Sequence, residues 1–258
     1  MVRNKSIALL ILFLGTTLLS FGNSTDKPQT NDQKPLSVLL NIQSRVDSIV
    51  GYCFSIKDEK ELNTILKDLQ EEYQKHPVDI NLYWQGYVQY YTSILQDFTD
   101  RSSEGKKTLK DGIETLEKTN KKNSETYALL GMMRSFSIRY NKFSAIFISK
   151  EAQKCASKAI QLDPKNPRGY YVKGSHEYYT PKNMRNNSKA IDNLKKTIQY
   201  SHTALSNPFM PSWGEKEAYE LLIRLYKESK EEEKAKEYYK EAKNRFPNNY
   251  RFNDFDSI

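Results

Sequence analysis

The stretch KEAYELLIRLYKESKEEEKAKEYYKEAKNRFPNN, residues 216–249, decides the fold. Large side chains such as Tyr219 and Tyr226 recur at helical spacing, and the small residues Ala235 and Ala242 recur after a polar turn. Two helical stripes separated by such a turn form a hairpin that cannot bury its apolar side alone. We therefore predict an all-α protein built from stacked copies of this hairpin.

Further copies occur upstream. HPVDINLYWQGYVQYYT (76–92) aligns with DPKNPRGYYVKGSHEYYT (163–180), and SETYALLGMMRSF (124–136) lies between them. The copies share a glycine in the first helix of each pair: Gly86, Gly131 and Gly174. A glycine inside a helix costs about 1 kcal/mol relative to alanine, so its recurrence predicts a close approach of two helices at each of these positions.

Other segments give more local predictions. Apolar spacing predicts one helix over Leu36–Ile56 and a second over Asp58–Lys75, which ends because a residue before proline leaves the helical region. Asn207–Gly214 (NPFMPSWG) predicts a loop, whose apolar residues either pack or form an exposed recognition element. Ser212 with Glu215 is the pattern of a capping box opening the last hairpin. The tail from residue 250 predicts a short capping segment over that hairpin.

The first 22 residues resemble an export signal, with a basic start, an apolar run and small residues before Gly22. Cleavage near Gly22 would place the protein in the periplasm or outside the cell; the alternative is an uncleaved membrane anchor. We predict residues 1–22 as signal peptide, 23–34 as disordered linker, 35–77 as a degenerate helix pair and 78–258 as the repeat domain.

Composition argues against several functions. The formal charge is +8, and +6 without the signal, but lysines interleave with acidic residues as on a solvated helix face, so we expect no nucleic-acid partner. His76, His176 and His202 are far apart, and the sequence has no nucleophile motif, no phosphate-binding glycine loop and no zinc motif. We expect no enzyme activity, cofactor or metal, and a membrane contact only through an uncleaved signal.

Cys53 and Cys155 would both enter an oxidising compartment, where a disulfide is possible. About one hundred residues separate them, and a bridge needs Cα atoms within about 7 Å. The interpretation that we favour is two buried thiols on apolar helix faces.

Together these residues resemble the tetratricopeptide-repeat family, a right-handed α-solenoid of antiparallel helix hairpins. Residues 216–249 match its 34-residue unit at Ala235, Ala242 and Pro247, although Ile223 stands where the family usually has glycine. The family places inward-facing residues of each first helix along a concave groove. Carried over by position, the resemblance implies a groove formed by Tyr83, Tyr87, Tyr90, Tyr91, Met132, Phe136, Arg168, Tyr171, Tyr178, Tyr179 and Arg224.

Tyrosine offers a large apolar area with a hydroxyl, which suits a peptide or a sugar, but tyrosines at helical spacing can equally fill the core of long hairpins. The function that we predict is a non-catalytic, exported scaffold that holds a protein or peptide partner on its Tyr-rich face. The alternative is an exported carrier of a small molecule or lipid that serves a transporter. The sequence does not name the partner.

Overall fold

The computed structural model describes residues 37–204, 207–247 and 249–255, so the predicted signal peptide and linker lie outside the described residues. The described chain is helical, and it divides into two compact units. The first comprises the described residues up to Lys121 together with Phe136–Phe143 and Asn207–Met210. The second comprises Lys122–Ser135 with the described parts of Ser144–Ser206 and Pro211–Ile258. The predicted boundary at residues 77 and 78 thus lies inside the first unit.

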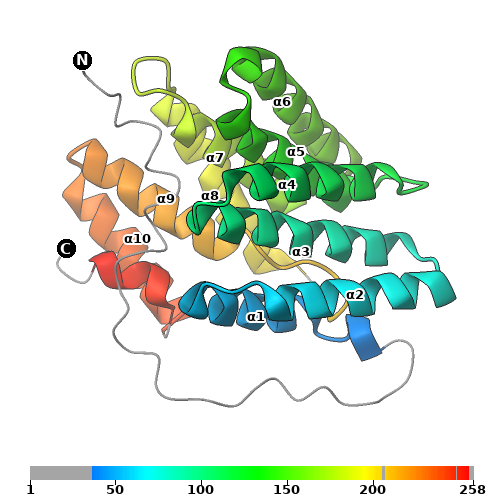
Figure 1. The fold of residues 1–258 in the computed structure, drawn as a ribbon. Coiled ribbons are helices and arrows are strands. Elements are labelled where there is room, and N and C mark those ends of the chain that lie inside the picture. Colours follow the sequence, from blue (N-terminus) through cyan, green and yellow to red (C-terminus); the bar gives the residue numbers. More distant parts are fainter. Residues whose placement is uncertain (1–36, 205–206, 248, 256–258) are drawn as a thin grey trace. The chain divides into compact units, whose positions relative to one another are not determined.

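In the first unit, a 3₁₀ turn, η3 (Ser37–Leu39), precedes two helix pairs. These pairs are α1 (Ile42–Ile56) with α2 (Lys60–Lys75), and α3 (Asp79–Phe98) with α4 (Ser102–Glu117). The helices α2 and α3, and α3 and α4, lie side by side (Figure 1). The predicted helix from Leu36 is wrong in its first turns, because Asn41 takes a left-handed conformation with φ of 51° and the helix begins after it.

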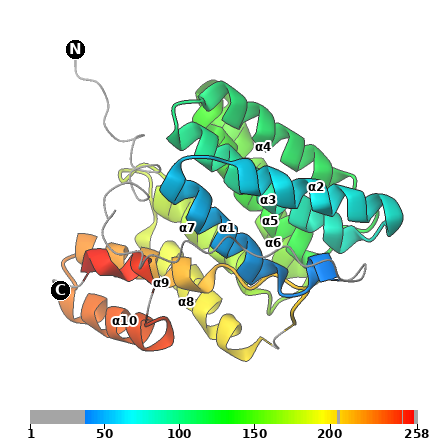
Figure 2. The same ribbon diagram turned by 60° about the horizontal axis from the view of Figure 1, so that its bottom comes forward.

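In the second unit, the helices are the larger part of α5 (Ser124–Ser137), α6 (Ala145–Leu162), α7 (Pro167–Tyr179), α8 (Asn187–Thr203), α9 (Glu215–Glu228) and α10 (Glu232–Arg245). Figure 2 shows the last pair beside the 3₁₀ helix η6 (Tyr250–Phe255). The side chains of Phe252 and Phe255 are buried at 0% and 2% exposure, so the predicted capping segment is confirmed.

The long connection between α5 and α6 contains two 3₁₀ turns, η4 (Ile138–Tyr140) and η5 (Lys142–Ser144). The glycine prediction is confirmed in both units. A Cβ on Gly86 would lie 2.8 Å from Leu116 Cγ of α4, and one on Gly174 would lie 2.8 Å from Leu194 Cγ of α8. A Cβ on Gly131 would lie 3.2 Å from a backbone oxygen of α6. Each glycine therefore marks where the second helix of a pair crosses the first.

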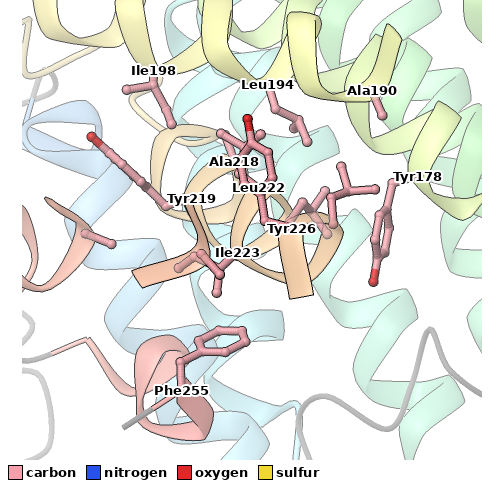
Figure 3. Close-up of a cluster of buried hydrophobic side chains, with 14 of the residues drawn as sticks. Tyr178, Ala190, Leu194, Ile198, Ala218, Tyr219, Leu222, Ile223, Tyr226 and Phe255 are labelled. Atoms are coloured by element: carbon pink, nitrogen blue, oxygen red, sulfur yellow. The ribbon is translucent and has the colours of Figure 1, made fainter. Parts of the chain in front are cut away.

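The second unit has a continuous apolar core between α8, α9 and η6, and Figure 3 shows its side chains. Leu194 of α8 and Leu222 of α9 are fully buried in it, and Phe255 of η6 belongs to the same cluster. The small residues Ala235 and Ala242 of α10 are also fully buried, which explains their spacing in the sequence. The all-α class is confirmed.

The start of α9 differs from the prediction. The helix begins at Glu215 with Gly214 as N-cap at φ of 106°, so the proposed pairing of Ser212 with Glu215 is wrong. Instead the carboxylate of Glu217 accepts the Gly214 N–H at 2.9 Å. A left-handed N-cap favours glycine, and glycine has no side chain to return the bond, so only this half of a capping box exists. Trp213 is buried and packs against the Tyr171 ring at 5.8 Å.

Candidate functional site

A series of aromatic rings runs along α3 in the first unit and continues to the end of α5 and to η4. Side chains four or three residues apart on a helix share one face, and neighbouring rings here lie 5.0 to 6.4 Å apart between centroids. Most of the contacts are edge-to-face, the preferred geometry for aromatic pairs. We call this set the aromatic chain; in contact order it consists of Tyr83, Tyr87, Tyr91, Tyr90, Phe136 and Tyr140.

The inner end of the aromatic chain is sealed. Tyr83 and Tyr87 are each 1% exposed. Gln43 of α1 donates to the Tyr87 hydroxyl at 3.0 Å, and that hydroxyl donates in turn to Tyr91 at 3.5 Å. At the other end Tyr90 and Tyr91 are half-buried. The rings thus lead from the core to a partly accessible edge. This edge carries hydroxyl groups, and its ring surfaces can contact an apolar ligand.

The η4 turn is fastened beside this edge. Arg139 forms an ion pair with Asp97 of α3, and its guanidinium lies 4.8 Å from the centre of the Phe136 ring. Burial, followed by the nearby Asp97 carboxylate, raises the pKa of Tyr140 well above its usual range. The Tyr140 phenol therefore stays neutral at physiological pH, and its hydroxyl is buried and turned away from solvent.

In the second unit, Arg168 does not offer an open charge. Its guanidinium forms two hydrogen bonds of 2.5 Å with the Glu125 carboxylate, and both side chains are about 10% exposed. Asn166 accepts the Arg168 N–H at 2.9 Å as N-cap of α7. The Arg168 side chain therefore links the start of α7 to the start of α5, which is a structural role.

The tyrosines of α7 differ sharply from one another. Tyr178 is 7% exposed with the guanidinium of Arg185 5.1 Å from its ring centre, and burial raises its pKa to about 12. Tyr179 is 47% exposed, and Tyr171 is half-buried against Trp213. Only Tyr179 of the three presents much of its ring to solvent.

The two remaining predicted residues of the second unit are half-buried. Met132 lies on α5, and Arg224 lies on α9, where it donates to Glu220 at 3.1 Å. The structure therefore brings Tyr83, Tyr87, Tyr90, Tyr91 and Phe136 together in the first unit. The other predicted residues belong to the second unit.

His176 of α7 connects this helix to α5 and α6, which the sequence analysis did not predict. Its Nδ1 lies 3.0 Å from the Ser135 hydroxyl of α5, and its Nε2 lies 2.8 Å from the Ser149 hydroxyl of α6. Burial lowers the pKa of His176 from its ordinary value of 6.5. The neutral ring can donate to one hydroxyl and accept from the other, so it ties three helices together. A lone histidine in the sequence carries no signal of such partners.

A second feature missed by the sequence analysis is a row of buried amides on α3. Asn81, Gln85 and Gln89 are 0%, 6% and 8% exposed and lie one turn apart. Gln85 donates to Asn81 at 2.8 Å. The i, i+4 spacing of amides was the available signal, and it marks the side of α3 that faces α2.

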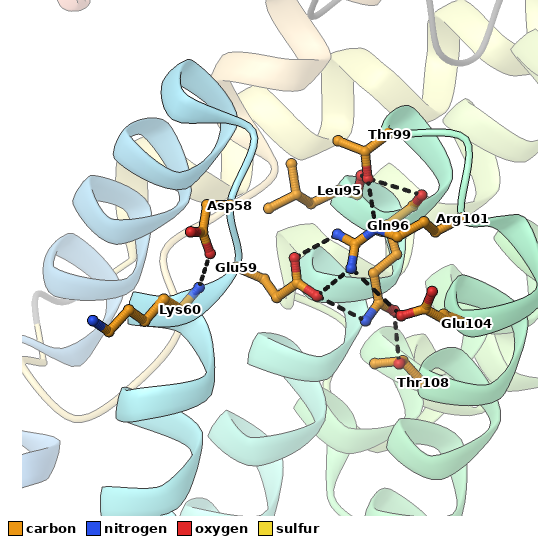
Figure 4. Close-up of polar contacts among 9 residues, drawn as sticks. All are labelled: Asp58, Glu59, Lys60, Leu95, Gln96, Thr99, Arg101, Glu104 and Thr108. Atoms are coloured by element: carbon orange, nitrogen blue, oxygen red, sulfur yellow. Dashed lines mark hydrogen bonds and ion pairs between the residues drawn. The ribbon is translucent and has the colours of Figure 1, made fainter.

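A broad depression of about 770 Å³ lies at the α1–α2 turn of the first unit. Its central contact is the ion pair of Glu59 with Arg101, at 2.6 and 2.5 Å, shown in Figure 4. Hydrogen bonds from Arg101 hold the pKa of Glu59 below its usual range. Lys57 and Lys60 are also among its lining residues. Since Glu59 neutralises the charge of Arg101, this ion pair serves a structural role, and Lys57 and Lys60 make the lining of the depression basic.

Among the residues that the structure describes, no group of three or more histidine, cysteine and acidic side chains could hold a metal ion. In the same residues, no helix is long and apolar enough to cross a bilayer. Cys53 and Cys155 are buried thiols, at 0% and 9% exposure, as the favoured interpretation predicted.

No family model matches the chain, and no curated protein matches it by sequence. Among solved structures, the chain is similar to the HusA haemophore from Porphyromonas gingivalis, with a TM-score of 0.53 and 21% identity. The match covers 72% of this chain and 92% of the haemophore chain. At this identity the likeness establishes a shared helical fold.

Proposed function

We propose that this protein is an exported, non-catalytic binding protein whose aromatic chain takes up a flat, largely apolar ligand of the haem class. The observation that carries the proposal is the run of touching rings from the sealed Tyr83 to the half-buried Tyr90 and Tyr91. Rings fixed by packing lose little conformational entropy when a ligand binds, and they provide a large contact area.

The size of the accessible edge favours a small ligand over an extended peptide. Tyr83 and Tyr87 are each 1% exposed and Phe136 is 5% exposed, so three of the five predicted groove residues in this unit cannot be reached by a ligand. What is left is the outer part of Tyr90 and Tyr91, whose hydroxyls can donate to a ligand carboxylate. A planar molecule that stacks on one or two rings and carries an acidic edge suits this surface.

The choice of haem as the first ligand to test is supported by the fold shared with a haemophore. The likeness transfers no binding residue, because 21% identity does not carry side-chain roles. The case for the aromatic chain therefore rests on the burial and ring contacts of this chain's own residues.

A protein or peptide partner is the second candidate, with the chain as a divergent tetratricopeptide-repeat scaffold. Supporting it are the helix pairs with a glycine at each crossing, and Tyr179, which is 47% exposed on α7 of the second unit. An exposed tyrosine is a frequent anchor in protein interfaces. Capture of a protein partner that is lost in the Tyr179→Ala variant would favour this candidate.

The test is a haem titration of the chain from Asn23 onward, followed by absorbance. We expect saturable binding, weakened about two- to tenfold by Tyr90→Ala and again by Tyr91→Ala, the range for an aromatic contact of about 0.5–1.5 kcal/mol. The matched control is Tyr52→Ala, which removes a tyrosine of α1 that is 42% exposed. Circular dichroism verifies that each variant folds. Absence of saturable binding by the unmodified chain, or equal losses in all three variants, would contradict the proposal.

A further inference from the structure

The first turn of α6 exposes large apolar side chains. Ile146 is 76% exposed and Phe147 is 68% exposed, whereas most side chains of this size in the described chain are buried. Phe143, three residues earlier in the chain and assigned to the first unit, is wholly exposed. Single exposed apolar residues are ordinary, but two adjacent large ones in one turn of α6 are unusual and indicate a contact surface.

The two helix residues lie on the solvent side of α6. The opposite side is defined by Ala152, Ala156 and Ala159, each fully buried. At 100° per residue, Ile146 and Phe147 fall on the outer side of the helix. They are therefore exposed along the side of α6 that packs against nothing else in the described part of the second unit.

The same outer side continues as a row of lysines. Lys150, Lys154 and Lys158 follow the apolar turn at intervals of four residues, and all three are exposed. Lys154 bonds to Glu151 at 2.8 Å, and Glu151 also lies 3.8 Å from Arg134. The row keeps a net positive charge after this pairing. An apolar tip followed by a basic stem is complementary to a surface with an apolar interior and anionic headgroups.

We propose that the N-terminal turn of α6 docks the protein on an anionic phospholipid membrane, with Ile146 and Phe147 inserted and the lysines at the headgroups. At a rise of 1.5 Å per residue, Lys150 and Lys154 lie about 4.5 and 10 Å along the helix from Phe147. Interfacial side chains enter to about 5–10 Å, so both ammonium groups would reach the phosphate level when the tip is inserted end-on. This departs from the sequence-based expectation of membrane contact only through the signal.

The docking surface and the aromatic chain have no residue in common, so the two proposals can fail independently. The membrane is favoured over a protein partner because the lysines form one row of a single charge sign directly behind a small apolar tip. A second copy of this chain would bring the same positive row against itself, which is unfavourable.

The experiment is flotation of the chain from Asn23 onward with vesicles of phosphatidylcholine, with and without phosphatidylglycerol. We expect binding only to the anionic vesicles, weakened by added salt. The paired change Ile146→Ser with Phe147→Ser should lower the bound fraction at least tenfold, because each inserted side chain contributes at least one order of magnitude when fully transferred. Lys150→Glu with Lys154→Glu should lower it by a similar factor.

The matched control is Leu162→Ser, which removes an apolar side chain, 47% exposed, at the far end of the same helix. Because every changed side chain is exposed, folding should be unaffected, and circular dichroism checks this. The proposal is overturned if the unmodified chain does not float with anionic vesicles. It is also overturned if the Ile146/Phe147 variant floats as well as the control, or if that variant instead abolishes a dimer seen without vesicles.

Discussion

Replacing Gly86 with alanine should destabilise the protein even though alanine is the better helix former. The added Cβ would lie 2.8 Å from Leu116 Cγ and 2.9 Å from its Cδ2, whereas carbon atoms normally approach to about 3.5–4.0 Å. Leu116 is fully buried, so it cannot swing into solvent. Overpacking of this kind costs about 1–3 kcal/mol, and the gain in helix propensity offsets about 1 kcal/mol. We expect a net loss of up to about 2 kcal/mol.

The chain provides a matched control on α1 in the same unit. A Cβ on Gly51 would meet nothing within 4 Å, so Gly51→Ala should increase the free energy of unfolding by about 0.5–1 kcal/mol. The contrast between the two alanine variants should therefore be about 1–3 kcal/mol. Urea unfolding followed by circular dichroism at a common temperature measures it.

A double-mutant cycle makes the argument sharper. Leu116→Ala alone should cost about 2–5 kcal/mol through the cavity that it leaves. In that background the Gly86 methyl group no longer meets a leucine, so Gly86→Ala should change sign and stabilise by up to about 1 kcal/mol. If Gly86→Ala stabilises the unmodified protein as much as Gly51→Ala does, the close-crossing explanation of the recurring glycines is wrong.

Two further predictions concern the second unit. The pKa of His176 is lowered in the folded state, so the folded protein binds fewer protons than the unfolded chain. The contribution of His176 to the free energy of unfolding should be fully present above its unfolded pKa of 6.5 and should be lost as the pH drops through the folded pKa. A His176→Gln variant should lose this pH dependence in urea titrations at several pH values. An unchanged pH profile in the variant would contradict the assignment. Arg168→Met should cost about 3–5 kcal/mol because it leaves the Glu125 carboxylate buried without its partner, and adding Glu125→Leu should recover much of the loss; equal stability of the single and double variants would contradict this account.

The helix pairs could be predicted because their apolar spacing and their breakers are local signals. The residue before Pro77 ends α2 where the sequence indicates, since proline restricts its predecessor whatever the tertiary structure. The start of α1 could not be predicted in the same way. Asn41 takes a left-handed conformation that the apolar spacing around it does not encode.

The sequence predicted which residue types form the candidate site, but it did not predict how far each side chain is exposed to solvent. Tyr83 and Tyr90 follow the same spacing on α3, yet one is 1% exposed and the other is half-buried. The difference depends on which neighbours cover each ring, for example Gln43 of α1, which reaches Tyr87 from 44 residues away in the sequence. Helical periodicity identifies a face and cannot say how far along it the packing extends.

The same limit explains why the exposure of Ile146 and Phe147 could not be predicted from the sequence. In the sequence they resemble the core positions of a helix, and only the structure places them on the outer side of α6. Conversely, Arg168 occupies a position that the repeat resemblance assigns to a groove, and the structure pairs it with Glu125. Contacts of this range lie outside what spacing along one helix can report.

The most direct test of the proposed function is a crystal structure of the chain from Asn23 onward grown with saturating haem. The account predicts electron density for a planar ligand stacked on the exposed edges of Tyr90 and Tyr91, with a carboxylate near a tyrosine hydroxyl. Ordered ligand density against other residues, with the aromatic chain unchanged and solvent at its edge, would contradict it.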